Sequence, residues 1–446
     1  MAKISWEDGL ALEQRIAWII REMEIGGVTF DIDRARYLVK DLESRKDKFY
    51  SEIRPYLSLY VDIQETKING EYRYVKKIRN KDGSYSKSAL GFYNPELLGG
   101  PFSRVNFIEP KLSQRQELVK QLLREGWKPK EKTEKGFPQL TIKGEPVASL
   151  KTMGPFGESL AEWYVCNHRQ GQIQGFIDKV RRDGKLTPGN RPCATNTFRS
   201  RHSVIANLPR VSSFYGKEIR SLMTVPDGYS MVGADLSGLE LRLLAHYMRD
   251  PTFIELILNG DVHTYNQNLM GLSTRDQAKT AIYGFLYGSG DAKFGSIIGG
   301  GSKEGKQMKA RLLKGLPALS SLLKRVQSFS SKRGWLPSLD NRKVYLRSYE
   351  GKILTHTALN TLLQSTAAII SKRWIQISYD EIKKRGLDAS LCIFMHDELQ
   401  WQVKNGFEEE VGNILISSAG LSGEYYNTRI PMDAEYKIGR NWADTH

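Results

Sequence analysis

The sequence predicts an α+β protein. Three observations favour this class: helical spacing of apolar residues prevails as far as about Lys324, a short apolar strand interrupts it at 231–236, and strand-like alternation returns in about the last hundred residues. With 446 residues, 40% of them hydrophobic, the chain is long enough for a large core and roughly two or three domains. No internal repeat is found, so a solenoid is not expected.

The N-terminal part is expected to be mainly helical. Helical spacing up to Met23, a turn at Gly26–Gly27 and a long charged segment from about Arg34 predict two successive helices. Residues 62–88 differ because they are polar and basic, and Asp82–Gly83 is a typical hairpin-turn pair. We expect this segment to be an exposed insertion.

Charge and cysteine content narrow the function classes. Lys and Arg number 66 against 50 Asp and Glu, a net charge of +16 that favours a nucleic-acid partner, although a basic surface can also serve solubility alone. The three cysteines lack CxxC spacing, so we expect neither a disulfide framework nor a zinc site, and we interpret them as reduced core thiols. No apolar run approaches the roughly 20 residues of a membrane span and no signal peptide is evident, so we expect a cytoplasmic protein.

A carboxylate at a strand end is the first candidate for chemistry. In MVGADLSGLELRLLAHYM an apolar strand ends at Asp235, turns through Ser237 and Gly238, and continues into a helix that contains Glu240. Such a carboxylate can hold Mg²⁺ together with a backbone carbonyl and substrate phosphates. The alternative is that Asp235 only caps the helix.

The second candidate is the segment LCIFMHDELQWQV. An apolar run meets His396 and Asp397, after which apolar and polar residues alternate, so we expect a hairpin with acids at its tip. Carboxylates from two separate strands can bind two Mg²⁺ about 4 Å apart and support phosphoryl transfer. The alternative is an ordinary surface turn.

The third candidate is RDQAKTAIYGFLYG, in which Arg275, Lys279, Tyr283 and Tyr287 are four residues apart. Each step of four drifts only about 40° around a helix, so the four side chains lie along one face. The cations suit phosphate oxygens and the tyrosines suit a sugar or base. The alternative is an amphipathic helix with a solvated basic edge.

These three segments stand in the order of the motifs of the DNA polymerase I family, family A. ADLSGLELR resembles motif A, RDQAKTAIYGFLYG motif B and FMHDELQ motif C, and the likeness extends from about Ile4 to His446. The sequence resembles most closely the replicative polymerases of short-tailed lytic phages. The resemblance implies a right-hand fold with an antiparallel-sheet palm, helical fingers and a helical thumb. The implied domains are 1–30 beside the palm, 31–190 thumb with the insertion near 62–88, 191–248 palm, 249–338 fingers and 339–446 palm.

The resemblance also implies an activity: DNA-directed DNA polymerase, a nucleotidyltransferase that uses two Mg²⁺ and deoxynucleoside triphosphates to extend a primer on a DNA template, with release of pyrophosphate. The implied metal ligands are Asp235, Asp397 and the carbonyl of Leu236, and the implied catalytic residues are Asp235, Asp397 and Lys279. The implied nucleotide contacts are Arg275, Lys279, Tyr283, His263 and Glu240, the last as a gate against ribonucleotides. The implied DNA contacts are Tyr287 on the template stack, Arg199, Asn360 and Gln364 on minor-groove acceptors, and His396 near the primer terminus.

Several expectations concern what surrounds this polymerase unit. Asp62 and Glu65 do not form the Asp-x-Glu of the family's upstream exonuclease, so we expect no 3′–5′ exonuclease in this chain and a separately encoded one as a partner. The insertion near 62–88 falls where phage relatives bind a processivity factor, so it is expected to contact DNA or a partner, with a solvated loop as the alternative.

Two other functions compete with DNA synthesis. A single-subunit RNA polymerase or reverse transcriptase would share the carboxylates, but Glu240 and the spacing of motif B argue against it. A DNA-binding accessory descended from a polymerase would not need the intact Asp235, Asp397, Arg275 and Lys279.

Overall fold

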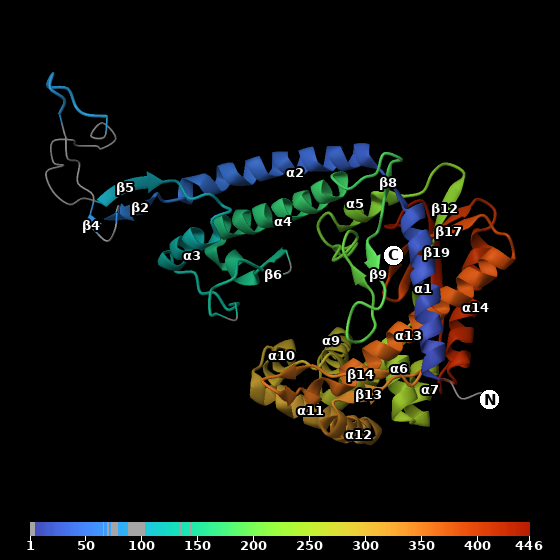
Figure 1. Cartoon of the computed structure of the whole chain (residues 1–446). Coiled ribbons are helices and arrows are strands. Elements are labelled where there is room, and N and C mark those ends of the chain that lie inside the picture. The colour runs from blue at the N-terminus through green and yellow to red at the C-terminus, as the bar shows by residue number, and fades with distance from the viewer. Residues whose placement is uncertain are drawn as a thin grey trace. The chain divides into compact units, whose positions relative to one another are not determined.

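The computed structural model describes residues 5–65, 67–68, 71–72, 79–87, 103–133, 135–142 and 144–446. The chain divides into two compact units, one made of Met1–Arg36 and Gly175–His446 and the other of Tyr37–Gln174 (Figure 1). Each unit has a hydrophobic core of its own. The predicted α+β class is therefore confirmed at the level of its mixed helices and antiparallel sheets.

The first unit is built on a four-stranded antiparallel sheet with the order β17-β18-β12-β19. Its strands are β12 (Tyr229–Leu236), β17 (Ala389–Met395), β18 (Glu398–Lys404) and β19 (Ala434–Gly439). Strand β12 pairs with β18 on one side and with β19 on the other. Helices α1 (Trp6–Gly26) and α14 (Glu408–Tyr425) pack against this sheet, and α13 (Ala358–Lys384) packs against both of these helices (Figure 1).

Helix α13 is the central helix of this unit. Most of its residues are buried, because α1, α14, α12 (Pro317–Arg333) and α6 (Leu239–Met248) all pack against it. Its buried residues include polar ones such as Ser365, Lys372 and Ser378 beside the apolar ones, so nearly every side of the helix lies inside the unit. Its Trp374 is fully buried and donates its indole N–H to the carbonyl of Leu415 at 2.7 Å.

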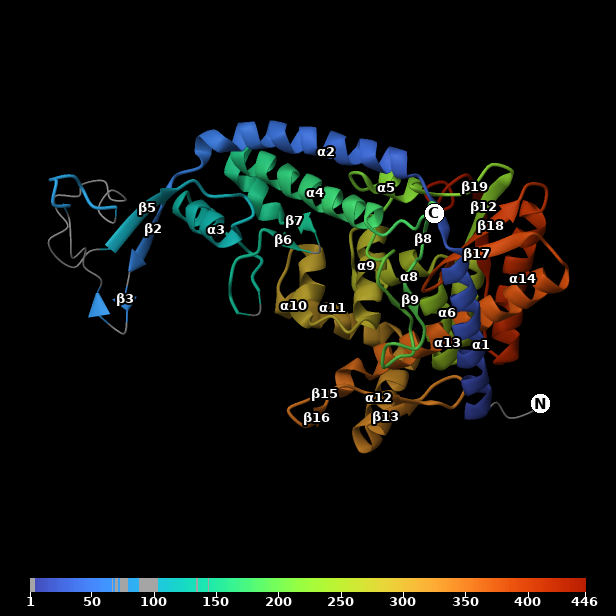
Figure 2. The same ribbon diagram turned by 45° about the horizontal axis from the view of Figure 1, so that its top comes forward.

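The remaining helices between β12 and α13 form a helical group (Figure 2). They are α7 (Pro251–Asn259), α8 (Val262–Met270), α9 (Arg275–Leu286), α10 (Asp291–Gly295) and α11 (Ser302–Gly315). Asp250, Asp261 and Thr274 cap α7, α8 and α9 through their side chains. Helices α10 and α11 approach closely at Gly305, where a Cβ atom would lie 1.9 Å from the carbonyl oxygen of Asp291.

Short elements complete the first unit. Strand β1 (Val28–Phe30) pairs with β8 (Lys185–Leu186) and with β11 (Met223–Thr224). In the sequence, β11 follows α5 (Gly216–Ser221) and precedes β12. The other paired strands are β9 (Asn190–Arg191) with β10 (Arg201–His202), β13 (Trp335–Pro337) with β14 (Lys343–Tyr345), and β15 (Ser348–Tyr349) with β16 (Lys352–Ile353).

Cys166 and Cys392 are buried, but Cys193 is exposed, so the interpretation of all three cysteines as core thiols was wrong for Cys193.

The second unit contains most of α2 (Ile32–Ile53) and α4 (Gly154–Ile177), joined by hydrogen bonds from Lys46 to Gln170 and from Ser159 to Glu52. It also contains α3 (Arg115–Arg124), β2 (Tyr60–Glu65) paired with β5 (Ser103–Ile108), β3 (Lys67–Ile68) paired with β4 (Glu71–Tyr72), and β6 (Thr141–Ile142) paired with β7 (Glu145–Pro146). None of the helices in the described ranges is both long and apolar enough to cross a membrane.

The predicted turn in the insertion is confirmed. The N–H of Gly83 donates to the carbonyl of Asn80, and the Asp82 carboxylate accepts from Ser84, so the turn is closed at both ends. Much of the remaining segment 62–88 lies outside the described residues.

A buried charge cluster ties α1 to α13. The ammonium of Lys372 is only 1% exposed and donates to Glu13 at 2.5 Å and to the carbonyl of Phe198 at 2.7 Å. Arg342 donates to the other oxygen of Glu13 at 2.6 Å. Burial lowers the pKa of Lys372, and the charge of Glu13 opposes that shift. The charged state of buried Lys372 is therefore favoured by the neighbouring carboxylate of Glu13.

We predict that Lys372→Met lowers the free energy of unfolding by about 3–5 kcal/mol, because it leaves Glu13 with a reduced set of partners in the interior. Denaturant unfolding measures this loss. The matched control is Lys384→Met on the same helix, whose ammonium is 79% exposed beside Glu381. A surface pair of this kind contributes little, so equal losses for the two variants would contradict the prediction.

Candidate active site

Acidic side chains from three strands meet at one edge of the sheet. Asp235 lies near the end of β12, and its register partners are Glu398 on β18 and Glu435 on β19. Asp397 lies in the tight turn between β17 and β18, and the N–H of Leu236 donates to its carbonyl oxygen at 3.0 Å. The predicted hairpin is thus confirmed, and its tip is bound to the end of β12.

The capping alternative for Asp235 is not what the structure shows. Helix α6 begins after Gly238, which has a φ of 59°, and no side chain caps its N-terminus. Across the described ranges, no residue donates a hydrogen bond to the Asp235 carboxylate, which is exposed at the strand end. This side chain is therefore accessible to a ligand.

The acids at this edge oppose one another's ionisation. Burial and then the neighbouring charges, that of Asp397 first among them, raise the pKa of Asp235 to about 7. Burial and then the charge of Glu240 raise the pKa of Asp397 to about 6, although the cation of Arg199 opposes this rise. The Asp235 side chain lies at the exposed end of the strand, and several like charges face it there, which disfavours its ionised form. A cation bound at this edge would relieve the repulsion.

Glu398, the other acid of the hairpin tip, has a structural role. It is 9% exposed and accepts hydrogen bonds from Gln400 and from the indole of Trp442, and it pairs with His446 at 3.3 Å. The alternation of polar residues in β18 gave no sign of this burial, because the C-terminal segment that covers them is distant in sequence. Thr445 completes the cover by donating to Gln400 at 2.7 Å.

The predicted face of α9 is confirmed. Arg275 and Lys279 are exposed, Tyr283 is half-buried and Tyr287, just after the helix, is 45% exposed. The buried residues of this helix are Ala278, Ala281, Ile282 and Leu286. The helix therefore presents two cations and two aromatic rings on one side.

The aromatic end of this face reaches the acidic edge. The hydroxyl of Tyr287 donates to Glu240 on α6 at 2.9 Å. Tyr283 precedes Tyr287 by one helical turn, and burial followed by the charges of Glu240, Asp397 and Asp235 raises the pKa of its hydroxyl to about 12.

The cationic end lies beside α8. The ring of His263 is 6.3 Å from that of Tyr283, and burial followed by the charges of Arg275 and Lys279 lowers the pKa of His263. Arg275 also forms an ion pair with Asp261 at 2.8 Å. Acids, tyrosines, His263 and cations thus form one continuous strip.

Of the predicted DNA contacts, Arg199 and His396 lie at this site. The charge of Arg199 acts on Asp397, Tyr287 and His396. Burial lowers the pKa of His396 to about 3, so its imidazole is neutral, and it packs edge-on against His202 at 4.8 Å. Asn360 and Gln364 stand one turn apart on the half-exposed side of α13, and no described contact joins them to the acids.

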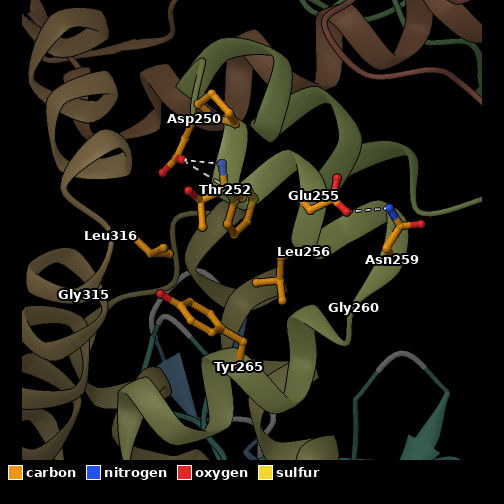
Figure 3. Close-up of a pocket in the computed structure, with 11 residues that line it drawn as sticks. Asp250, Thr252, Glu255, Leu256, Asn259, Gly260, Tyr265, Gly315 and Leu316 are labelled. Atoms are coloured by element: carbon orange, nitrogen blue, oxygen red, sulfur yellow. Dashed lines mark hydrogen bonds between the residues drawn. The ribbon is translucent and has the colours of Figure 1, made fainter.

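A separate hollow of about 700 Å³ lies in the helical group. It is lined by α7, α8 and the junction of α11 with α12, including Leu256, Tyr265 and Leu316 (Figure 3). None of the predicted site residues lines it. This hollow and the acidic edge are therefore different places, and the residues predicted from the sequence do not line the hollow.

A sheet that presents carboxylates opposite a helix of cations and tyrosines defines a nucleotidyltransferase of the polymerase type. The sequence profile of DNA polymerase family A matches residues 107–444. The DNA-directed DNA polymerases of Escherichia phage T7 and Enterobacteria phage T3 are each 31% identical, with 99% of this chain and 71% of the relative covered. This chain belongs to DNA polymerase family A.

A solved structure agrees at the level of the fold. The POL domain of Pol1 from M. smegmatis, in complex with DNA primer-template and dNTP, matches with a TM-score of 0.75 and 20% identity. The match covers 97% of this chain and 70% of that chain. The fold of a polymerase domain is thereby confirmed.

Proposed function

We propose that this chain is a DNA-directed DNA polymerase of phage-type replication that extends a primer on a DNA template and releases pyrophosphate. One observation carries the proposal: Asp235 near the end of β12 and Asp397 in the turn between β17 and β18 meet at one edge, where their charges act on Tyr283, whose helix also carries Arg275 and Lys279. Carboxylates that hold metal ions beside cations that hold phosphates are the parts that phosphoryl transfer requires.

We infer that two Mg²⁺ are held by Asp235, Asp397 and the carbonyl of Leu236. The donor set fits, because several like-charged carboxylates meet here and, after burial, their charges raise the pKa of Asp235 and of Asp397. In the part of the chain that is described, no three His, Cys, Asp or Glu side chains form a complete metal cage. Mg²⁺ commonly takes one or two carboxylates and completes its shell with water and substrate phosphates. When bound, it would favour the ionised primer hydroxyl and neutralise the departing pyrophosphate.

The nucleotide would lie along the strip formed by α9. Arg275, Lys279 and His263 hold its triphosphate, and Lys279 also serves as a catalytic residue at the leaving phosphates. Tyr283 faces the sugar. Glu240, which accepts a hydrogen bond from Tyr287, fills the space that a 2′-hydroxyl needs and so excludes ribonucleotides.

The DNA would be held by residues around this strip. Arg199, Asn360 and Gln364 contact minor-groove acceptors that all base pairs share, which senses pair geometry without reading sequence. Tyr287 supports the template stack, and neutral His396 approaches the primer terminus without adding charge.

The remaining assignments concern domains and partners. We propose that the sheet forms the palm, the helical group between β12 and α13 the fingers, and the unit Tyr37–Gln174 the thumb. The basic segment near 62–88 would bind DNA or a processivity factor, and a separate exonuclease would supply proofreading.

The test is primer extension by the purified chain on DNA and RNA templates, with deoxynucleotides and ribonucleotides compared. We expect template-directed addition of deoxynucleotides on DNA. A preference for ribonucleotides or for an RNA template would favour the RNA polymerase or reverse transcriptase alternative. Binding without extension would favour an accessory protein.

The raised pKa values predict that metal binding is coupled to proton release. Only the ionised carboxylates bind the metal, so the apparent Kd for Mn²⁺, a spectroscopic substitute for Mg²⁺, should rise as the pH falls through about 7 and then about 6. The rise approaches about tenfold per pH unit for each proton displaced. Titration of the enzyme bound to primer-template with Mn²⁺ at several pH values measures this Kd. Asp235→Asn should remove the change in Kd that is expected near pH 7. A Kd that does not change over this range would contradict the prediction.

A further inference from the structure

Asp261 makes four hydrogen bonds at the start of α8. Its Oδ1 accepts from the N–H groups of His263 at 3.0 Å and Thr264 at 3.2 Å. Its Oδ2 accepts from the Thr264 hydroxyl at 2.8 Å and from Nε of Arg275 at 2.8 Å. One carboxylate thus caps the helix that carries His263 and holds the guanidinium of the next helix.

The hydrogen bond from Arg275 to Asp261 leaves both Nη groups of the guanidinium available to a ligand. Only Nε is engaged, and neither Nη group has a hydrogen-bond partner anywhere in the described ranges. A guanidinium is a rigid planar fork, so fixing Nε also fixes the direction of the two Nη groups. These two groups can together bind phosphate oxygens in a bidentate way.

We propose that Asp261 is a positioning residue for the incoming nucleotide, which orients Arg275 and joins it to His263 so that both side chains meet the same triphosphate. This inference rests on the proposed function, because it takes Arg275 and His263 as triphosphate contacts. It assigns Asp261 no contact with the nucleotide.

The capping bonds explain why an exposed ion pair has this effect. Arg275 and Asp261 are 53% and 44% exposed, and pairs at such sites add little stability, partly because two side chains must be ordered. Here the three bonds from His263 and Thr264 already order the carboxylate. The hydrogen bond from Arg275, followed by that from Thr264, lowers the pKa of Asp261, so the carboxylate stays charged at neutral pH.

Asp250 provides a matched control. It caps α7 by accepting from the N–H groups of Thr252 at 3.0 Å and Phe253 at 3.3 Å, as the dashed lines in Figure 3 show. No ion pair to Asp250 is found within the described ranges. Asp250→Asn and Asp261→Asn both keep an oxygen that can cap the helix, but only Asp261→Asn removes a charged partner of an arginine.

The experiment measures the Kd of a matched deoxynucleoside triphosphate for the enzyme bound to a dideoxy-terminated primer, so that no chemistry follows binding. We expect Asp261→Asn to raise this Kd roughly tenfold, the size of one charge-assisted hydrogen bond, and Asp250→Asn to leave it unchanged. Since Asp261 acts through Arg275, Asp261→Asn should add no further loss to Arg275→Gln. Thermal unfolding should be the same for the two Asn variants.

Each other result has a definite meaning. If Arg275→Gln leaves the Kd unchanged, Arg275 does not hold the triphosphate and the proposed function of this residue fails. If Arg275→Gln weakens binding while Asp261→Asn does not, or if their losses add, the positioning role is wrong. Tighter binding by Asp261→Asn would also overturn it, because Asp261 would then compete with the nucleotide for Arg275.

Discussion

Primer extension should fall by about 10³-fold or more in both Asp235→Ala and Asp397→Ala, because each change removes a proposed metal ligand at the acidic edge. Binding of primer-template should persist, since phosphate contacts from Lys and Arg dominate the affinity for DNA. Single-turnover extension and equilibrium binding measure the two effects separately.

The Tm of the variants can show whether a loss of activity comes from unfolding. The pKa of Asp235 is raised to about 7, which means that its ionised form is disfavoured in the folded chain. Above that pH, removing the carboxylate should leave the Tm unchanged or higher, so loss of activity would not reflect unfolding. Asp227→Ala, which removes a fully exposed aspartate, should leave extension unchanged. Near-normal extension by Asp235→Ala or Asp397→Ala would overturn the catalytic assignment.

Tyr283→Phe should make the enzyme discriminate against dideoxynucleotides by a factor of about 10² or more, whereas the wild type should incorporate them readily. The tyrosine hydroxyl can provide a polar contact where the 3′-hydroxyl is missing, and phenylalanine cannot. The placement is supported by the pKa of Tyr283, which burial and then the charges of Glu240, Asp397 and Asp235 raise to about 12. Competition between deoxy and dideoxy substrates measures the ratio.

Tyr265→Phe is the matched control, because Tyr265 is an exposed tyrosine of α8 that lines the separate hollow. This variant should accept dideoxynucleotides as the wild type does. Equal discrimination by the wild type and Tyr283→Phe would show that Tyr283 does not face the sugar, and the proposed orientation of α9 would need revision.

The sequence alone determined the local parts of the site. A strand that ends at Asp235, a hairpin with Asp397 at its tip and a helix face with cations and tyrosines in steps of four were all predicted, and the structure contains each of them. These features depend on side-chain periods of two and 3.6 residues and on turn residues, which act within one short segment.

Only the tertiary structure decided which of these parts serve the site and which serve the fold. Glu398 follows Asp397 directly at the predicted acidic hairpin tip, yet the C-terminal segment with Trp442 and His446 buries it. The bonds between Tyr287 and Glu240 and between Arg275 and Asp261 likewise had no local signal. Such contacts join residues that are distant in sequence or lie on different helices, so they arise from how the elements pack, and no pattern within one element encodes them.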